Sequence, residues 1–132
     1  MIVIDTSVLI AIINHEPERD RLLRAITASE PCLLSAMTVF EANMVAYGRM
    51  RTAGTDRLND ILAAIDHQII PFDEAQGRIA LAAFQTYGKG IHAKARLNFG
   101  DCASYALAKS RGVPLLFKGA DFVDTDVAVA AA

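Results

Sequence analysis

Four acidic residues lie at points of the chain where they could hold a metal ion. Asp5 directly follows the hydrophobic run 1–4, and Glu41, Asp101 and Asp121 occur at comparable junctions. The run is typical of a short buried strand, whose carboxyl end would lie at the rim of a parallel sheet, where open α/β folds bind ligands. Four carboxylates at one rim would repel each other unless a cation lay between them. The pattern therefore points to a divalent metal and to phosphoryl chemistry.

Each of these carboxylates also has a structural explanation. Glu41 and Asp101 are expected in the first turns of helices, where a carboxylate interacts favourably with the helix dipole. Asp121 fits a simple turn. Asp5 is harder to explain in this way, because a carboxylate directly after a buried strand is costly unless it is paired or solvated. The joint placement of the four acids carries more weight than any one of them.

Other polar residues near these acids could contact a substrate. Thr6 and Ser7 carry hydroxyl groups that could contact phosphate or cap the following helix. Asn98 could contact substrate or be an ordinary loop residue. Asp124 and Asp126 lie close to the fourth acid, and either could supplement it.

A basic stretch lies between Glu74 and Asp101, where no acidic residue occurs. It holds Arg78, Lys89, His92, Lys94 and Arg96. A basic lip beside an acidic metal pocket would steer a polyanionic substrate toward the cation, which makes Lys94 and Arg96 candidate substrate contacts. An ordinary solvated loop explains the same residues equally well. The net charge of −2 does not by itself indicate a nucleic-acid-binding protein.

Four short apolar segments are predicted to form the strands that position these acids. They are β-branched or leucine-rich and carry few polar residues, as is typical of strands buried on both faces. They cover residues 1–4, 32–35, 68–72 and 114–117.

Amphipathic segments between these strands predict helices over residues 8–14, 17–29, 38–51, 56–66, 73–87 and 101–111. Thr6 or Ser7 is expected to cap the first helix, and Thr38 with Glu41 fits the capping-box pattern. Gly54 is expected to end the third helical unit. Strands alternating with helices predict an α/β fold, a three-layer α/β/α sandwich with a small parallel sheet.

The composition is that of one ordinary domain spanning residues 1–132. Hydrophobic residues make up 53% of the chain, enough for a core without disulfides or structural metal. Cys32 and Cys102 form no disulfide framework and indicate a reducing compartment. No signal peptide or membrane-length apolar run is present, so a soluble, cytoplasmic protein without membrane contact is expected.

Four sequence strings carry a family resemblance. Residues 4–7, 38–41, 97–102 and 115–122 resemble the motifs of PIN-domain ribonucleases, and more narrowly the VapC toxins of bacterial type II toxin–antitoxin pairs. The resemblance extends from Met1 to about Asp126, and the order and spacing of the strings make it specific.

The resemblance implies an endoribonuclease that depends on Mg²⁺ or Mn²⁺ and is blocked by a VapB-type antitoxin. By analogy Asp5, Glu41, Asp101 and Asp121 would hold the metal and its nucleophilic water. A homodimer is also implied. The helical segments 42–50 and 61–65 could form a surface for the second copy or for the antitoxin, and core packing is the alternative explanation of their apolar residues. Many family members carry a further acid at the position of Gly119, so the number of metals stays open.

Three other functions fit parts of the same pattern. A phosphatase could use Asp5 as its nucleophile, although Ser7 stands where such enzymes usually carry a second Asp. A phospho-accepting receiver domain could use Asp73 after the third strand, but Asp5 lacks the expected acidic neighbour. A PIN-like module that binds RNA or protein without catalysis is the third, although all four acids are retained.

Overall fold

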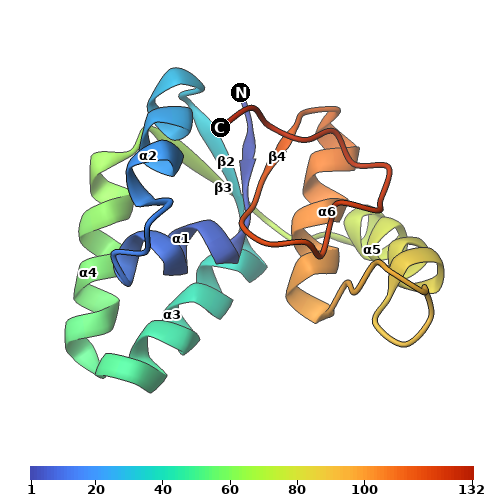
Figure 1. Ribbon diagram of the computed structural model, residues 1–132, viewed down its shortest axis with the longest axis horizontal. Coiled ribbons are helices and arrows are strands. Elements are labelled where there is room, and N and C mark those ends of the chain that lie inside the picture. Colours follow the sequence, from blue (N-terminus) through green and yellow to red (C-terminus); the bar gives the residue numbers. More distant parts are fainter.

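A four-stranded parallel sheet forms the centre of the molecule (Figure 1). The computed structural model describes residues 1–132. The strands lie in the order β3-β2-β1-β4 and comprise β1 (Val3–Ile4), β2 (Cys32–Ser35), β3 (His67–Ile70) and β4 (Leu115–Leu116). Parallel neighbours cannot be joined by tight turns, so helices provide the connections.

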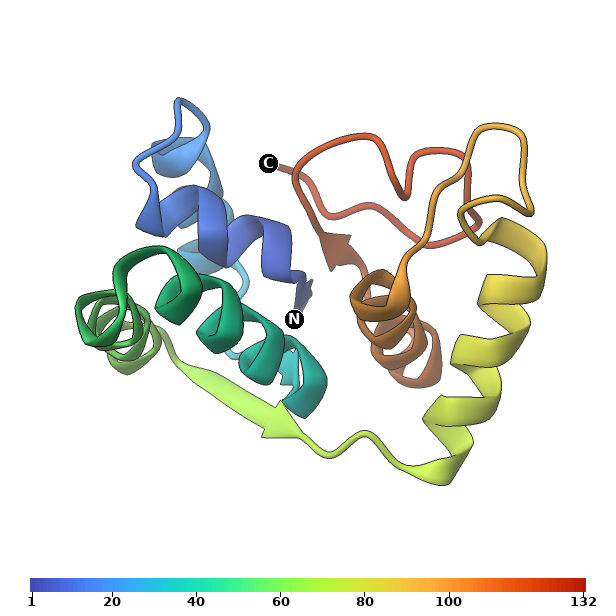
Figure 2. The same ribbon diagram turned by 90° about the horizontal axis from the view of Figure 1, so that it is seen from below.

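Six helices cover the two faces of this sheet. Figures 1 and 2 show α1 to α4 on one side of the strands and α5 and α6 on the other. The helices are α1 (Thr6–Ile13), α2 (Arg19–Ala28), α3 (Ala36–Met50), α4 (Thr52–Ala64), α5 (Glu74–Tyr87) and α6 (Phe99–Arg111).

Two separate hydrophobic clusters hold the layers together. Ile2 and Ile4 belong to the cluster that packs under α1 to α4. Val3, Leu33 and Leu115 belong to the second cluster, under α5 and α6. Successive side chains of a strand point to opposite faces, so this alternation places one core on each side of the sheet. The predicted three-layer α/β/α sandwich is confirmed.

The cap of α1 differs from the prediction. Asp5 is the N-cap, and its carboxylate accepts a hydrogen bond from the backbone N–H of Ser7 at 3.0 Å. Thr6 and Ser7 lie inside the helix instead of capping it. Asp5 is the only residue between β1 and α1, so the acid that ends the strand also caps the helix.

The capping box predicted in α3 is also wrong. Ser35 caps this helix by accepting a hydrogen bond from the backbone N–H of Met37 at 3.2 Å. Thr38 is buried within the helix, and Glu41 lies beyond its first turn. Helix α3 starts at the end of β2, earlier than its apolar periodicity indicates.

Gly54 does not end a helix, as predicted, but lies inside α4, where the two antiparallel helices α3 and α4 come close together. A Cβ atom on Gly54 would overlap the backbone carbonyl of Ala46 in α3. The turn between the helices is made by Arg51, whose φ is 55°. Glycine is therefore needed at Gly54 for close packing of the two helices, and not for ending a helix.

The C-terminal segment returns to the edge of the sheet. The backbone N–H of Leu115 donates to the carbonyl of Ala128 at 2.8 Å, and that of Ala130 donates to the carbonyl of Leu115 at 2.9 Å. Val129 forms a single parallel bridge with Leu115, so no full strand is added. No helix of the protein has the length and apolar character needed to cross a membrane.

Candidate active site

Asp5 lies in the interior of the molecule at the end of β1, with only 2% of its surface exposed. Its Oδ1 accepts a hydrogen bond from the hydroxyl of Ser104 at 2.6 Å, and its Oδ2 accepts one from the hydroxyl of Ser7 at 2.7 Å. Burial raises the pKa of Asp5 in spite of these hydrogen bonds. A cation beside this carboxylate would therefore be favourable, because nothing else in contact with it carries positive charge.

Ser7 links Asp5 to the segment that follows β4. Its hydroxyl donates to Asp5 and accepts a hydrogen bond from the backbone N–H of Lys118 at 3.0 Å. The ammonium group of Lys118 is directed elsewhere, since it pairs with Glu16 and with Glu18, the latter at 3.3 Å. Lys118 thus contributes its backbone to this region, while its charge is neutralised by other acids.

Asp101 lies in the first turn of α6, where it forms a capping box with Asn98. The backbone N–H of Asp101 donates to Asn98 Oδ1 at 2.9 Å, and the backbone N–H of Asn98 donates to Asp101 Oδ2 at 3.1 Å. Asn98 is exposed, but its side chain is engaged in this cap. The helix dipole and the cap hold the Asp101 carboxylate at the start of α6.

The pKa of Asp101 shows that the four acids are neighbours. Burial raises it to about 8, from an ordinary value of 3.8, and the negative charge of Asp5 adds to the shift. The charges of Asp121 and Glu41 also raise it, while the hydrogen bond from Asn98 acts in the opposite direction. Four carboxylates from distant parts of the chain thus share one electrostatic environment.

Glu41 reaches this environment from the middle of α3. Its Oε1 accepts a hydrogen bond from the hydroxyl of Thr6 at 2.5 Å. A Cβ atom on Gly100 would overlap both carboxylate oxygens of Glu41, so the backbone of α6 approaches this side chain closely. Because Glu41 is not in the first turn of its helix, the structural explanation based on the helix dipole does not apply to it.

Of the three acids after β4, Asp121 is the one whose negative charge raises the pKa of Asp101. Asp126 is held elsewhere, by a hydrogen bond from the Tyr105 hydroxyl and an ion pair with Lys109 at 3.1 Å. Asp124 is exposed and has no salt bridge.

Sequence reasoning missed two residues of the site, Ser104 and Thr38. Ser104 is fully buried, and its hydroxyl is 3.2 Å from that of Thr38 as well as bonded to Asp5. The available signal was a serine one helical turn after Asp101, within an otherwise apolar stretch of α6. No local pattern indicated that Thr38 would face Ser104 from another helix.

The candidate substrate residues Lys94 and Arg96 lie apart from the carboxylates. Both are exposed on the loop that joins α5 to α6, and neither forms a salt bridge. This loop leads directly into the Asn98 cap of α6.

The donor set suits a hard divalent cation held partly through water. No group of three or more His, Cys, Asp or Glu side chains lies close enough together to hold a metal ion by itself. The acids nevertheless influence each other, as the pKa of Asp101 shows. Mg²⁺ commonly binds through one or two carboxylates and retains several waters, so it does not require a closed cage. The open arrangement therefore fits such a cation.

A small parallel sheet flanked by helices, with acids at the carboxyl ends of its strands, defines a class of protein. Residues 2–128 match the family model described as PIN domain, and the chain belongs to the PIN-domain family. Within that family its relatives are VapC ribonucleases. The chain is 44% identical over 131 residues to Ribonuclease VapC30 of Mycobacterium tuberculosis, with 98% of each chain covered.

Solved structures share the fold. VapC20 of Mycobacterium tuberculosis, described as a sarcin-ricin loop cleaving toxin, superposes with a TM-score of 0.77 at 15% identity, covering 96% of each chain. A toxin–antitoxin complex from Klebsiella pneumoniae gives a TM-score of 0.72 at 21% identity, covering 98% of this chain and 96% of that one. At these identities the likeness concerns the fold alone.

Proposed function

We propose that this chain is a metal-dependent endoribonuclease that acts as the toxin of a toxin–antitoxin pair. The observation that carries the chemistry is the buried Asp5 carboxylate, which is held by Ser7 and Ser104 and lies close enough to Asp101 for its charge to raise the pKa of Asp101. Such a pair of carboxylates is stabilised by a divalent cation. The ribonuclease names of its relatives support RNA as the substrate.

Asp5, Glu41, Asp101 and Asp121 are the residues that would hold the cation, and their oxygen donors suit Mg²⁺ and Mn²⁺ alike. When bound, such a cation lowers the pKa of a coordinated water and neutralises charge on the attacked phosphate. Oxygen donors alone do not distinguish the two metals, and Gly119 supplies no additional ligand.

The remaining polar residues orient the carboxylates. Ser7 and Ser104 each donate to one oxygen of Asp5, and Thr6 donates to Glu41. Because these hydrogen bonds exist before substrate arrives, the carboxylates need little reorganisation during the reaction. We therefore assign Thr6, Ser7 and Asn98 to positioning, and leave Lys94 and Arg96 as the residues free to contact RNA.

Cleavage of total cellular RNA tests the proposed function. Purified protein, freed of any bound antitoxin, is incubated with RNA in Mg²⁺, in Mn²⁺ or in EDTA, beside an Asp101→Asn variant. Cleavage is expected with metal only, and is expected to be lost in the variant. If the folded protein cuts no cellular or structured RNA with either metal, the proposal fails in favour of a binding module.

The geometry argues against Asp5 as a phosphorylated residue. Ser7, which stands where such a phosphatase carries its second Asp, is engaged in hydrogen bonds with Asp5 and with the backbone of Lys118, so no second acid is present to serve as the general acid. Asp73, the candidate acceptor of a receiver domain, is the N-cap of α5 and accepts a hydrogen bond from the backbone N–H of Gln76 at 2.9 Å. The phosphatase and receiver functions are therefore not supported.

The remaining assignments follow from the relatives and from the chain itself. A VapB-type antitoxin is the proposed protein partner, supported by the toxin–antitoxin complex that shares this fold. Residues 1–132 are proposed to form one domain, because both hydrophobic clusters lie against the same sheet. A reducing cytoplasm is the proposed location, consistent with two buried cysteines that form no disulfide.

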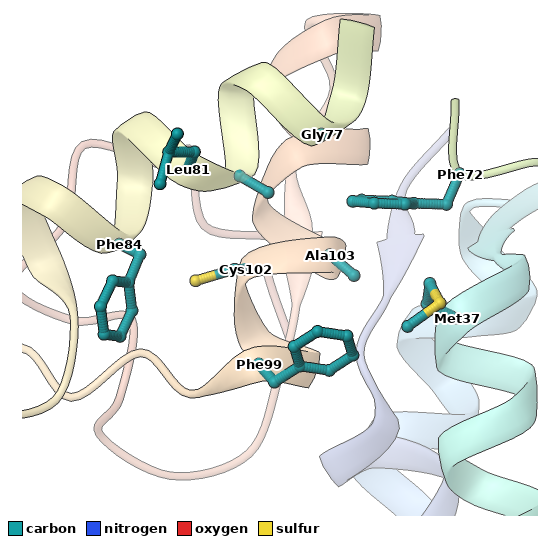
Figure 3. Close-up of a pocket in the computed structure, with 9 residues that line it drawn as sticks. Met37, Phe72, Gly77, Leu81, Phe84, Phe99, Cys102 and Ala103 are labelled. Atoms are coloured by element: carbon teal, nitrogen blue, oxygen red, sulfur yellow. The ribbon is translucent and has the colours of Figure 1, made fainter. Parts of the chain in front are cut away.

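A homodimer is the proposed assembly, and an apolar groove is the surface we assign to it. The groove has a volume of about 440 Å³ and lies between α5, the start of α6 and the first turn of α3 (Figure 3). It is lined by Met37, Phe72, Gly77, Ala80, Leu81, Phe84, Phe99, Cys102 and Ala103. A smaller hollow beside it adds Phe40 and Met44 and ends at Glu41.

The size and chemistry of this surface favour a second copy of the chain. Phe99 is 79% exposed and Leu81 is 58% exposed, although both are large and apolar. Phe72 and Phe84 add partly exposed aromatic surface beside them, and aromatic residues are enriched in the cores of interfaces between protein chains. No lysine or arginine lines the groove, which disfavours RNA as its occupant.

The mass of the protein in solution, measured by sedimentation, tests whether it forms a dimer through this groove. A Leu81→Asp variant places a charge in the groove and is expected to sediment as a monomer at concentrations where the native protein is dimeric. The matched control is Val123→Asp, since Val123 is equally exposed but lies outside the groove. A native protein that remains monomeric at high micromolar concentration would refute this assembly.

A further inference from the structure

The loop between α5 and α6 carries three cations that no acid neutralises. Lys89, Lys94 and Arg96 are exposed, and none of them forms a salt bridge. The loop spans residues 88–98 and contains no acidic residue of its own. An uncompensated cationic loop is an attractive site for a polyanion.

The two ends of this loop are held together by backbone hydrogen bonds. The N–H of Lys89 donates to the carbonyl of Leu97 at 3.0 Å, and the N–H of Leu97 donates to the carbonyl of Tyr87 at 3.1 Å. Ala95 and Leu97 are fully buried, so they anchor the returning half of the loop to the body of the protein. Lys94 and Arg96 flank Ala95 and therefore point outward from a fixed stretch of backbone.

The side chain of His92 holds the residues that follow it in the loop. Its Nδ1 accepts hydrogen bonds from the backbone N–H groups of Lys94 at 3.0 Å and Ala95 at 2.8 Å. Its ring lies beside Tyr87, with the ring centres 5.9 Å apart. The side chain thus takes the part that an aspartate or asparagine plays in an Asx turn, in which a side-chain acceptor shapes the following residues.

The loop lies on the approach to the acids. Figure 1 shows it on the side of the molecule where β1 ends and α6 begins. Its last residue, Asn98, caps α6 by accepting a hydrogen bond from the backbone N–H of Asp101. A nucleic acid whose scissile phosphate lies at Asp101 would therefore pass close to Arg96 and Lys94.

We propose that His92 is a positioning residue that shapes loop 88–98 into a binding site for the RNA phosphodiester backbone, with Lys94 and Arg96 contacting phosphates. The proposal rests on the proposed ribonuclease function and specifies how the substrate is held beside the acids. His92 contacts neither RNA nor metal. It acts through the backbone of the two residues whose N–H groups it accepts.

Two substitutions of His92 distinguish its positioning role from a general contribution to protein stability. His92→Ala removes the acceptor and is expected to raise KM for RNA about tenfold, which is within what two hydrogen bonds can supply, while kcat changes little. His92→Asn restores an acceptor that can bond the same N–H groups and is expected to recover most of the affinity. Unchanged KM in a folded His92→Ala protein, or an Asn variant no better than the Ala variant, would overturn the proposal.

A second measurement does not depend on how the His92 variants fold. A Lys94→Ala/Arg96→Ala double variant is expected to bind single-stranded RNA with a shallower salt dependence, the slope falling by about 0.7 for each lost phosphate contact. Arg24→Ala is the matched control, because Arg24 is an exposed cation on α2. Equal slopes for the native protein and the double variant would overturn the proposed contacts.

RNA binding measured in EDTA distinguishes this inference from the proposed function. If the native protein cleaves RNA with metal, and the loop variants bind and cleave RNA as well as it does, the loop binding site is refuted and the ribonuclease function stands. If the native protein neither binds nor cleaves RNA, both the loop binding site and the ribonuclease function are refuted. Weaker binding in EDTA by the loop variants, with native metal affinity, is the expected result.

Discussion

Hydroxyl groups orient the buried carboxylates at the level of single residues. Ser104 is the central one, since it donates to Asp5 while lying 3.2 Å from the Thr38 hydroxyl. The pair of hydroxyls connects α6 with α3 on the opposite face of the sheet, and Ser104 connects both helices to Asp5. The orientation of the acid thus depends on packing between layers.

Gly100 provides a test of how closely Glu41 must be placed. In Gly100→Ala the new methyl group would overlap the Glu41 carboxylate, which can move aside because it ends a flexible side chain. The variant is therefore expected to fold, and to lose RNA cleavage by about 100-fold, as misplacement of a catalytic group by about 1 Å can cause. Initial cleavage rates and the thermal unfolding midpoint are the measurements.

Gly77→Ala is the control for this substitution, because a Cβ on Gly77 would meet only Phe72, at an ordinary contact distance of 3.9 Å. It is expected to leave the cleavage rate unchanged. Native cleavage by Gly100→Ala would mean that the position of Glu41 does not limit the reaction.

Each helix that bears a catalytic candidate starts where its supporting strand or loop ends. Asp5 itself caps α1, and Asp101 forms a capping box with Asn98 at the start of α6, whereas α3 is capped by Ser35 and not by Glu41. For these two acids, capping patterns alone therefore could not separate a structural carboxylate from a functional one. Changes at these two caps also alter both helix stability and the site.

The hairpin of α3 and α4 gives a prediction at the level of elements. Gly54→Ala is expected to destabilise the protein by about 1–3 kcal/mol, because the methyl group overlaps the backbone of Ala46, which cannot move aside. Gly48→Ala, in α3 with open space around its Cβ position, is expected to stabilise by roughly 0.5–1 kcal/mol.

Urea unfolding of the two glycine variants checks this pair. Midpoints shifted in opposite directions are expected. Two shifts of the same sign would show that helix propensity, and not the close approach of the two helices, governs Gly54.

The stability of the whole metal-free molecule is expected to depend on the buried acids. The pKa of Asp101 is about 8 in the folded protein and near 3.8 when exposed, so folding favours the protonated form. This contribution is fully present below about pH 4 and is lost as pH rises toward 8. The unfolding free energy in EDTA is therefore expected to fall over this range, and Mg²⁺ is expected to restore it at pH 8.

Comparison with Asp101→Asn isolates this effect, because the amide does not titrate. The unfolding free energy of both proteins is measured in EDTA from pH 5 to pH 8. The variant is expected to become steadily more stable relative to the native protein as pH rises. Parallel pH profiles would show that Asp101 ionises normally and that the acids do not repel each other.

Much of the fold and the four acids could be predicted from sequence. Runs of four or five apolar residues separated by amphipathic segments predict the order of strands and helices. A strand buried on both faces is apolar throughout, whereas a helix buried on one face has apolar residues every three or four positions. An acid directly after a buried strand, as at Asp5, is costly unless it is paired or solvated, and this local signal led to the prediction of a site there. The family resemblance drew on the same strings of residues.

Only the tertiary structure decided how these residues meet. The pairing of Ser104 with Asp5, the contact of Gly100 with Glu41 and the groove around Phe99 each join segments far apart in the chain. Such contacts depend on the order β3-β2-β1-β4 and on which helix covers which face. A local pattern contains no information about a partner a hundred residues away, so it identified the acids but not the groups that hold them in place.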